Sequence, residues 1–386
     1  MELSFVLAGK GGNICNMNCR YCSADIQLDK NAKITDIEID YKAMEEKIRS
    51  NPIYQAYLVD KNNPNKKAPE QKLTVNFWGG DPLMHTKIWD EMMEWLDTII
   101  LDYSIFISTN GLLFGAKHVQ DWCDAHWGNK DQRKNIMFQI SHDGLGQYIR
   151  SKDFDPFYDP KTKDFIVKMA RRGQFKYINC TMNAYNCSPQ GNKMYFDKWI
   201  FDNGITPGSM YIKLNHNNDA DYTEPFRLKG ESLRRYMHEM FLLWIDAYFE
   251  PDRPDMLPYR DYLMNQAKRN ETFKGLGGCG LFSSGARDYS WAMNTKGEYV
   301  YCQLCNDNDS CPNPKCEMSE ECSHCEFRNM DDCHPCPAMS QPKDCEYKKE
   351  YIRAVLRFNT FIQKHERYIR NLQANQSKKS CSCRPQ

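Results

Sequence analysis

Three cysteines near the amino terminus have the types and the spacing needed for redox chemistry. Cys15, Cys19 and Cys22 follow the pattern C-x3-C-x2-C. A cubane 4Fe–4S cluster normally takes four cysteine thiolates, so a set of three leaves one iron free to bind a small ligand. The spacing therefore predicts chemistry at the cluster itself rather than simple electron storage.

The triplet could also contribute to a zinc site, or its thiols could have no common role. Zinc sites usually take four ligands from paired C-x2-C arms. The first histidine of the chain, His85, is far from the triplet in sequence. These features favour the iron–sulfur cluster over zinc.

The loop around the triplet resembles that of a known enzyme family. Residues 9–26, GKGGNICNMNCRYCSADI, are similar to the cluster loop of the radical S-adenosylmethionine (SAM) enzymes. In that family the free iron chelates the amino and carboxylate groups of SAM. One electron then splits the sulfonium and releases a 5′-deoxyadenosyl radical, which abstracts hydrogen from the substrate.

Three later segments extend the resemblance. WGGDP (78–82) is similar to the family's GGEP segment, whose backbone binds the SAM amino group, with Asp81 where glutamate is usual. STNG (108–111) and SHDG (141–144) are similar to segments that line the SAM ribose and carboxylate. Each could also be an ordinary turn, and an aspartate before glycine, such as Asp143, often caps one. The resemblance implies SAM contacts from Tyr21, Gly79, Gly80, Asp81, Asn110, Ser141 and Asn183.

The elements that must position these residues alternate between short apolar runs and helix-like stretches. Predicted strands cover 4–8, 73–77, 104–108, 136–140, 177–182 and 210–214. Between them lie amphipathic stretches such as 84–100, where Trp89, Met92 and Leu96 recur at helical spacing. This alternation predicts βαβ units, a parallel sheet and hence an α/β fold with a partial (βα)6 TIM-like barrel. Each SAM-binding segment then follows a strand, at the edge where parallel barrels bind ligands.

Ten of the 18 cysteines lie between residues 279 and 345. Their order resembles the SPASM domain, which holds two auxiliary 4Fe–4S clusters in many radical SAM enzymes, although several gaps differ from the usual ones. The resemblance implies that the first auxiliary cluster takes Cys279, Cys302 and Cys336, with Cys305, Cys311 or Cys316 available as a fourth ligand. It implies that the second takes Cys322, Cys325, Cys333 and Cys345. Structural zinc sites are the alternative, because C-x2-C pairs also occur in zinc ribbons.

We expect five segments along the chain. They are a radical SAM barrel over 1–215, a helical bridge over 216–275, a SPASM-like domain over 276–346, a C-terminal helix over 347–375 and a disordered tail over 376–386. Strong helical patterns cover 229–250 and 347–372. The polar stretch 60–71 is expected to be a surface insertion, and the tail is polar enough to stay disordered.

Composition excludes several classes of partner. Lys and Arg together number 51, as do Asp and Glu, so nothing indicates a nucleic-acid surface. No apolar run reaches the length of a membrane span, and the opening residues do not form a secretory signal, so we expect no membrane partner and a cytoplasmic location. Cysteines should stay reduced there, which favours metal thiolates over disulfides.

The resemblance implies an oxidoreductase that cleaves SAM and modifies a residue of a ribosomally made peptide or protein, by a crosslink, a thioether, epimerisation or dehydrogenation. Auxiliary clusters can accept an electron from a substrate radical, which makes the net reaction a two-electron oxidation. A flavodoxin- or ferredoxin-type protein is the expected electron donor.

Other functions remain open from the sequence. In the SPASM pattern the second cysteine belongs to a G-x4-C motif, here Gly297-x4-Cys302. Formylglycine-forming relatives carry an aspartate directly after that cysteine, whereas this chain has Gln303, which weakens the assignment to formylglycine formation. One alternative is a radical SAM dehydrogenase of a small molecule such as a sugar or amino sugar. Another is a non-catalytic iron–sulfur or zinc protein for electron transfer. The sequence identifies no catalytic acid or base.

Overall fold

The computed structural model describes residues 2–7, 14–17, 19–22, 37–62, 73–100, 103–127, 136–216, 224–268, 290–300, 320, 324–326 and 345–381. Most of the cysteine-rich segment and residues 63–71 of the predicted insertion lie outside these ranges. The first residues of that insertion, up to Lys61, belong to a helix, α2 (Pro52–Lys61).

A seven-stranded parallel sheet forms the centre of the fold, in the order β6-β5-β4-β3-β2-β1-β7. The strands are β1 (Glu2–Val6), β2 (Leu73–Trp78), β3 (Tyr103–Thr109), β4 (Ile136–Ser141), β5 (Phe175–Met182), β6 (Tyr211–His216) and β7 (Ser290–Asn294). The first six match the six strands predicted from the sequence. They are neighbours in chain order, as expected for consecutive βα units, so the predicted partial TIM-like barrel is confirmed.

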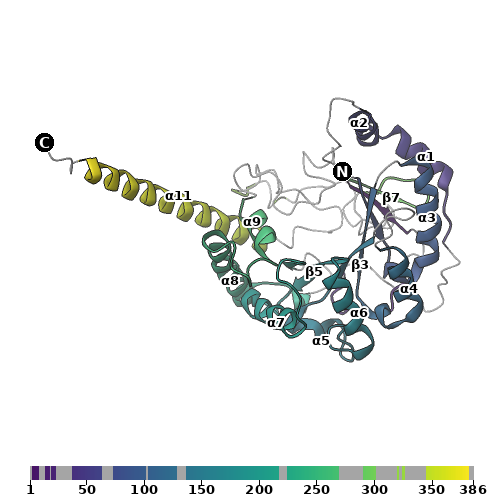
Figure 1. Ribbon diagram of the computed structural model, residues 1–386, viewed down its shortest axis with the longest axis horizontal. Helices are drawn as coiled ribbons and strands as arrows, with labels where there is room; N and C mark the ends of the chain where they lie inside the picture. Colours follow the sequence, from purple (N-terminus) through teal and green to yellow (C-terminus); the bar gives the residue numbers. More distant parts are fainter. Residues whose placement is uncertain are drawn as a thin grey trace.

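Helices cover the outer, convex side of the curved sheet (Figure 1). The α-helices of the described residues are α1 (Tyr41–Ser50), α2, α3 (Thr86–Ile99), α4 (Lys117–Ala125), α5 (Gln147–Arg150), α6 (Pro160–Arg171), α7 (Pro189–Asp202), α8 (Gly230–Phe249), α9 (Arg260–Lys268) and α11 (Cys345–Cys381). Of these, α11 packs on α8 and projects away from the barrel (Figure 1). Capping side chains fix where two of them begin. Asp159 before α6 and Ser188 before α7 each accept backbone N–H bonds, and proline follows each cap.

The two faces of the sheet differ in polarity. In β3, Ile105 and Ile107 are fully buried on the helix side, whereas Phe106 and Ser108 on the other face are half-buried. On this inner face Gln139 donates to the Ser108 hydroxyl at 3.0 Å, and Lys213 donates to Gln139 at 3.4 Å. Among the described residues, the inner face therefore carries hydrogen-bonding side chains beside aromatic ones such as Phe106, which packs on Tyr177.

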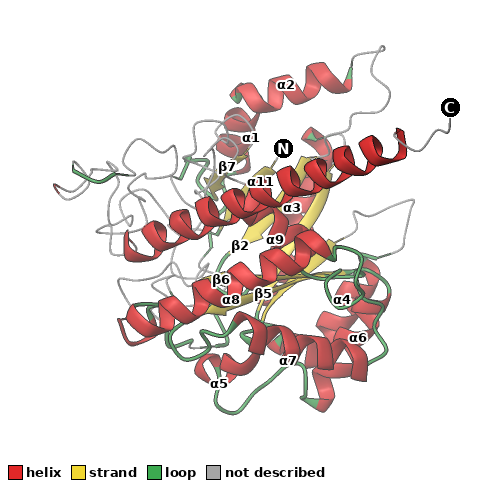
Figure 2. Cartoon of the chain, turned by 90° about the vertical axis from the view of Figure 1, so that its left-hand side faces the viewer, coloured by secondary structure: helices red, strands yellow, loops and turns green. Residues whose placement is uncertain are grey.

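The C-terminal helix is longer than the sequence pattern suggests. The helix predicted over 347–372 runs from Cys345 to Cys381, so the expected disordered tail is corrected for residues 376–381. Alanine, glutamine and lysine are good helix formers, and no glycine or proline interrupts them before Pro385. The first half of α11 runs beside α8 (Figure 2). Trp244 of α8 meets Tyr351 and Phe358 of α11 edge to face.

β7 ties the start of the cysteine-rich segment to the barrel. It pairs with β1, from Glu2 opposite Ser290 to Val6 opposite Asn294. The chain then turns back, and the Tyr299 hydroxyl accepts from Asn51 at 2.9 Å and donates to the Lys47 carbonyl of α1. The sheet thus continues beyond residues 1–215, where the barrel was expected to end. Within the described ranges, none of the helices combines the length and the apolar character needed to cross a bilayer.

Candidate active site: the cysteine loop and the strand ends

The three cysteines of the triplet lie on one loop after β1, and all three are half-buried. Within the loop the Met17 N–H points at the Cys15 sulfur at 3.4 Å, and the Cys22 N–H donates to the Cys19 carbonyl at 3.1 Å. Among the described residues no three His, Cys, Asp or Glu side chains converge tightly enough to hold a single metal ion. A cubane is bound differently, because its thiolates stand around four irons rather than one.

Asp81 joins the cysteine loop to the end of β2. Its backbone N–H donates to the Ile14 carbonyl at 3.0 Å, one residue before Cys15. Its buried carboxylate accepts from the Leu83 N–H at 3.0 Å and from the Thr109 hydroxyl at 2.8 Å. The segment 78–82 therefore fixes the loop through Asp81, while Gly79 and Gly80 stay half-buried at the bend beside it.

Asn110 makes a second junction, at the end of β3. Its amide donates to the Asn16 side-chain oxygen at 2.7 Å and points at the Cys15 sulfur at 3.6 Å. Its own carbonyl oxygen accepts from the Leu112 N–H, which orients the amide. Gly111 follows with φ of +82°, a conformation that suits glycine. The sequence placed Asn110 among SAM contacts; the structure places it against the cysteine loop.

A third junction lies at the end of β4. The Tyr21 hydroxyl donates to the Asp143 carboxylate and accepts from Arg150 at 3.1 Å. The Arg150 guanidinium is 3.6 Å from the same carboxylate, which also accepts from the Thr181 N–H at 3.1 Å. Tyr21 was predicted as a SAM contact, and its hydroxyl belongs to this internal network. The Asp143 side chain makes no capping hydrogen bond to its own turn, and bonds instead to the cysteine loop and to β5.

The ends of β4 and β5 are joined by asparagine side chains. The Asn186 amide donates to the Asp143 carbonyl and to the Thr181 carbonyl, both at 3.0 Å. Asn183 is buried, and its side-chain oxygen accepts from the Tyr185 N–H at 2.9 Å. Ser141, the last residue of β4, is half-buried. Both predicted SAM-binding positions therefore lie at the same edge of the sheet as the cysteine loop.

Several buried donors at this edge have no acceptor within the described part of the chain. They are the side-chain N–H groups Asn16 Nδ2, Trp78 Nε1, Arg150 Nε and Asn183 Nδ2. Leaving such a group unsatisfied is costly, so an acceptor is expected for each one, from a ligand or from residues outside the described ranges. The carboxylate, the ribose hydroxyls and the adenine ring nitrogens of SAM are acceptors that fit this set of donors.

Electrostatics at the loop also suit an iron–sulfur cluster. Burial, followed by the charge of Asp81, raises the pKa of the Cys15 thiol to about 12. A thiolate at this place needs a compensating positive charge, and a coordinated metal deprotonates a thiol outright. The residues present therefore fit a cluster held by Cys15, Cys19 and Cys22.

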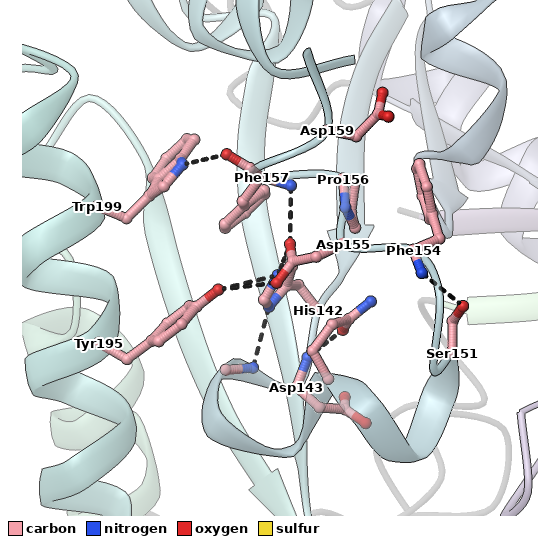
Figure 3. A network of polar contacts seen from close by, with 12 residues as sticks. His142, Asp143, Ser151, Phe154, Asp155, Pro156, Phe157, Asp159, Tyr195 and Trp199 are labelled. Carbon is pink, nitrogen blue, oxygen red and sulfur yellow. Dashed lines mark hydrogen bonds and ion pairs between the residues drawn. The ribbon is translucent and has the colours of Figure 1, made fainter. Parts of the chain in front are cut away.

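A separate network locks the loop that follows β4, and Figure 3 shows it. His142 is fully buried, and its Nδ1 accepts from the Gly144 N–H at 3.0 Å while its Nε2 bonds Asp155 at 2.9 Å. The ring stacks on Phe157 with centroids 4.1 Å apart, and Tyr195 donates to Asp155 at 3.2 Å. Both ring nitrogens are in use, so His142 holds the structure together and is not a candidate catalytic base.

Sequence reasoning missed two residues of these networks. Arg150 ends a short helix, α5, that has no periodic apolar pattern, and Asp155 lies in an irregular segment. Their partners are brought close only by the folded β4 end. Of the predicted auxiliary ligands, only Cys325, which is half-buried, and Cys345, the first residue of α11, belong to the described residues. The other auxiliary cysteines lie outside them.

No protein-family model matches the chain, and no curated protein matches its sequence. Solved structures of anSMEcpe, a radical SAM/SPASM anaerobic sulfatase-maturating enzyme, do match. The structure with bound AdoMet (SAM) has a TM-score of 0.58 at 14% identity and covers 93% of this chain and 98% of that one. The structure with AdoMet and the Cp18Cys peptide has a TM-score of 0.57 at 14% identity, covering 94% and 99%. The described residues of this chain therefore share the fold of these solved structures.

Proposed function

We propose that this chain is a radical SAM enzyme of the SPASM type that oxidatively modifies a residue of a ribosomally made peptide or protein. The observation that carries the proposal is the anchoring of the cysteine loop. Asp81, Asn110 and Asp143, from three successive strand ends, each bond to residues beside the triplet. Such an arrangement presents three thiolates at the edge where parallel barrels bind their ligands.

The comparisons support the choice of ligands. The structures with the same fold contain AdoMet, and two of them contain the peptides Cp18Cys and Kp18Cys. When bound at the cluster, SAM would supply a 5′-deoxyadenosyl radical for hydrogen abstraction. The residues of this chain would bind and orient it: the buried amides of Asn16 and Asn183 as donors, and Asn110 as the support of the loop.

The inner face of the sheet supports a polar substrate. Gln139, Lys213 and Asn215 line it and hydrogen-bond with their neighbours. A peptide offers carbonyl and N–H groups that can hydrogen-bond with these side chains, which an apolar substrate cannot do. We propose that the substrate residue enters the barrel along this face.

Two auxiliary clusters and an external electron donor complete the proposal. The auxiliary clusters would accept the electron that the substrate radical loses, and their ligands are those implied by the SPASM resemblance. A surface cavity of about 360 Å³ lies beside the cysteine loop, lined by Asn16, Met17 and Arg20. Because this side of the loop is open to solvent, we propose that a flavodoxin- or ferredoxin-type donor approaches the cluster here.

The test is to purify the protein anaerobically and to quantify iron, sulfide and zinc. We expect about twelve irons per chain, falling by about four in a Cys15/Cys19/Cys22→Ala variant. Cys187→Ala, which removes a half-buried thiol outside the loop, is the control and should leave iron unchanged. Incubation with SAM and dithionite should then release 5′-deoxyadenosine from the wild type but not from the triple variant. Full iron loading without that product would overturn the proposal.

A second measurement addresses the substrate. Candidate peptides incubated with the reconstituted enzyme should lose a mass that corresponds to two hydrogens, as detected by mass spectrometry. Oxidation of a sugar or amino sugar, with no change in any peptide, would instead identify the protein as a dehydrogenase of small molecules. Zinc in place of the auxiliary clusters would leave SAM cleavage intact but remove the acceptor for the second electron.

A further inference from the structure

Arg150 is a buried cation that contacts the cysteine loop at Tyr21. Its side chain is 10% exposed, and it ends α5, directly after the turn that leaves β4. One of its terminal nitrogens donates to the Tyr21 hydroxyl at 3.1 Å and lies 3.6 Å from Asp143. Tyr21 is 5% exposed and stands between Cys19 and Cys22 in the chain. Arg150 and Asp143 together therefore hold the part of the loop that carries two of the three thiols.

The charged partner of Arg150 is the Asp143 carboxylate. Burial lowers the pKa of the Arg150 guanidinium, but the neighbouring acidic groups raise that pKa above the ordinary value. In return its positive charge opposes the effect of burial on the pKa of two carboxyl groups, Asp143 and Asp81. One guanidinium thus acts as a counter-charge for carboxyl groups at two strand ends.

A buried guanidinium has to be paired to be tolerated, and removing one partner of such a pair leaves an uncompensated charge. Coordination of a cluster would add thiolates to this region, and reduction would add one electron. A neighbouring positive charge stabilises the more negative of two redox states. Net charge and hydrogen bonding around a cluster are among the factors that set its reduction potential.

We propose that Arg150 is a positioning residue that seats the cysteine loop through Tyr21 and Asp143, and whose charge raises the reduction potential of the cluster held by Cys15, Cys19 and Cys22. This inference rests on the proposed function. It adds a role for a residue that lies outside the cysteine triplet and outside the predicted SAM contacts.

Three variants separate the effect of the Arg150 charge from the effect of its contacts with Tyr21 and Asp143. Arg150→Met removes the charge but keeps most of the side-chain stem. Arg150→Lys keeps the charge but lacks the planar fork that spans Tyr21 and Asp143. Tyr21→Phe removes only the bridging hydroxyl. The matched control is Arg172→Met, because Arg172 is a mostly buried guanidinium that pairs with Asp124 at 2.6 Å on the outer helices.

The readouts are iron content, the midpoint potential of the SAM cluster in a dye-mediated EPR titration without SAM, and the Kd for SAM. We expect Arg150→Met to shift the midpoint to more negative values and to weaken SAM binding at least about tenfold. Arg150→Lys should restore the midpoint but not the SAM affinity. Tyr21→Phe should leave the midpoint near wild type and weaken SAM binding, and Arg172→Met should change none of the three readouts.

An unchanged midpoint and unchanged SAM affinity in Arg150→Met, with wild-type iron content, would overturn the inference while leaving the proposed function standing. Loss of stability equal to that of Arg172→Met with no change in potential would also overturn it, since that result reports a structural ion pair only. A wild type that holds no cluster at the triplet would instead overturn the proposed function, and the inference with it.

Discussion

The carboxylate of Asp81 accepts a 2.8 Å hydrogen bond from the backbone N–H of Asn110, which ties the turn after β2 to the turn after β3. Asp81 also bonds through its backbone to Ile14, and Asn110 bonds through its amide to Asn16. The two turns therefore hold the cysteine loop on both sides of Cys15. Asp81 and Asn110, which the family resemblance assigns to SAM binding, make these contacts with the loop.

This arrangement predicts that Asp81 cannot be exchanged for the glutamate that is usual in the family. A longer side chain would move the carboxylate away from the Leu83, Thr109 and Asn110 donors, which are fixed by the backbone. We expect Asp81→Glu and Asp81→Asn each to lower the free energy of unfolding by about 2–3 kcal/mol, since buried donors lose a charged acceptor. Urea unfolding measures this. SAM affinity, measured by calorimetry, should fall with it.

Asp121→Asn is the control for these two variants, because Asp121 forms an exposed i,i+4 ion pair with Lys117 and should change stability by less than about 0.5 kcal/mol. Wild-type stability together with wild-type SAM affinity in Asp81→Glu would show that the turn can adapt to the longer residue. The anchoring role assigned to Asp81 would then be wrong.

The His142–Asp155 pair predicts a graded loss of stability. His142→Leu leaves the Asp155 carboxylate and the Gly144 N–H without this partner, so we expect a loss of about 2–3 kcal/mol. Tyr195→Phe removes only one hydroxyl at 3.2 Å from Asp155 and should cost about 1 kcal/mol. Thermal unfolding of the two variants tests the order. Equal losses would show that the His142–Asp155 hydrogen bond and the stacking of His142 on Phe157 add nothing beyond the contribution of the Tyr195 hydroxyl.

Much of the fold could be predicted because its signals are local. The six barrel strands are short apolar runs separated by amphipathic stretches, and the parallel topology follows from that alternation. The polar segments after β2, β3 and β4 could be assigned to one edge because parallel strands end on the same side. The sequence alone thus brought Asp81, Asn110 and Asp143 to the same region as the triplet.

The remainder depends on contacts that no local pattern encodes. β7 pairs with β1 across almost 290 residues, and its five residues lie in a segment dominated by cysteines. Arg150 and Asp155 gain their roles only when the end of β4 brings His142 and Asp143 to them. The end of α11 was underestimated for another reason: its last residues favour helix by intrinsic propensity but lack the apolar stripe used to recognise one.

His85 predicts a pH dependence of stability. It is 1% exposed, and burial lowers its pKa from the ordinary value to about 4. Neither ring nitrogen has a partner among the described residues. The pKa of His85 is lower in the folded state than in the unfolded state. The stability that comes from burying the neutral ring is therefore fully present above about pH 6.5 and is lost as the pH falls towards 4. We expect the free energy of unfolding to decrease by about 1.4 kcal/mol per pH unit within that window.

His85→Met should remove this part of the pH dependence, because methionine fills a similar apolar space without titrating. His118→Met, at an exposed position of α4, is the control and should keep the wild-type slope. Urea midpoints at pH 7.5, 6.5 and 5.5 give the comparison. A His85→Met profile parallel to that of the wild type would contradict the assignment.

Gly297 and Gly173 form a matched pair that tests the attachment of the cysteine-rich segment. Their φ angles are +77° and +79°, so alanine is strained to a similar degree at both, by about 1–2 kcal/mol. A Cβ at Gly297 would lie 2.7 Å from the Ala43 carbonyl carbon, whereas nothing lies within 4 Å at Gly173. The difference in stability between the two alanine variants therefore measures the packing of the turn after β7 against α1.

We expect Gly297→Ala to lower the unfolding midpoint clearly more than Gly173→Ala, and to make the cysteine-rich segment more sensitive to limited proteolysis. The reason is that α1 must shift to admit the methyl group, and the Tyr299 contacts with Lys47 and Asn51 shift with it. Because Cys302 follows this turn by only a few residues, the auxiliary iron content of Gly297→Ala should fall as well. Equal midpoints and equal iron in both variants would show that the contact between the turn and α1 does not fix the position of the cysteine-rich segment.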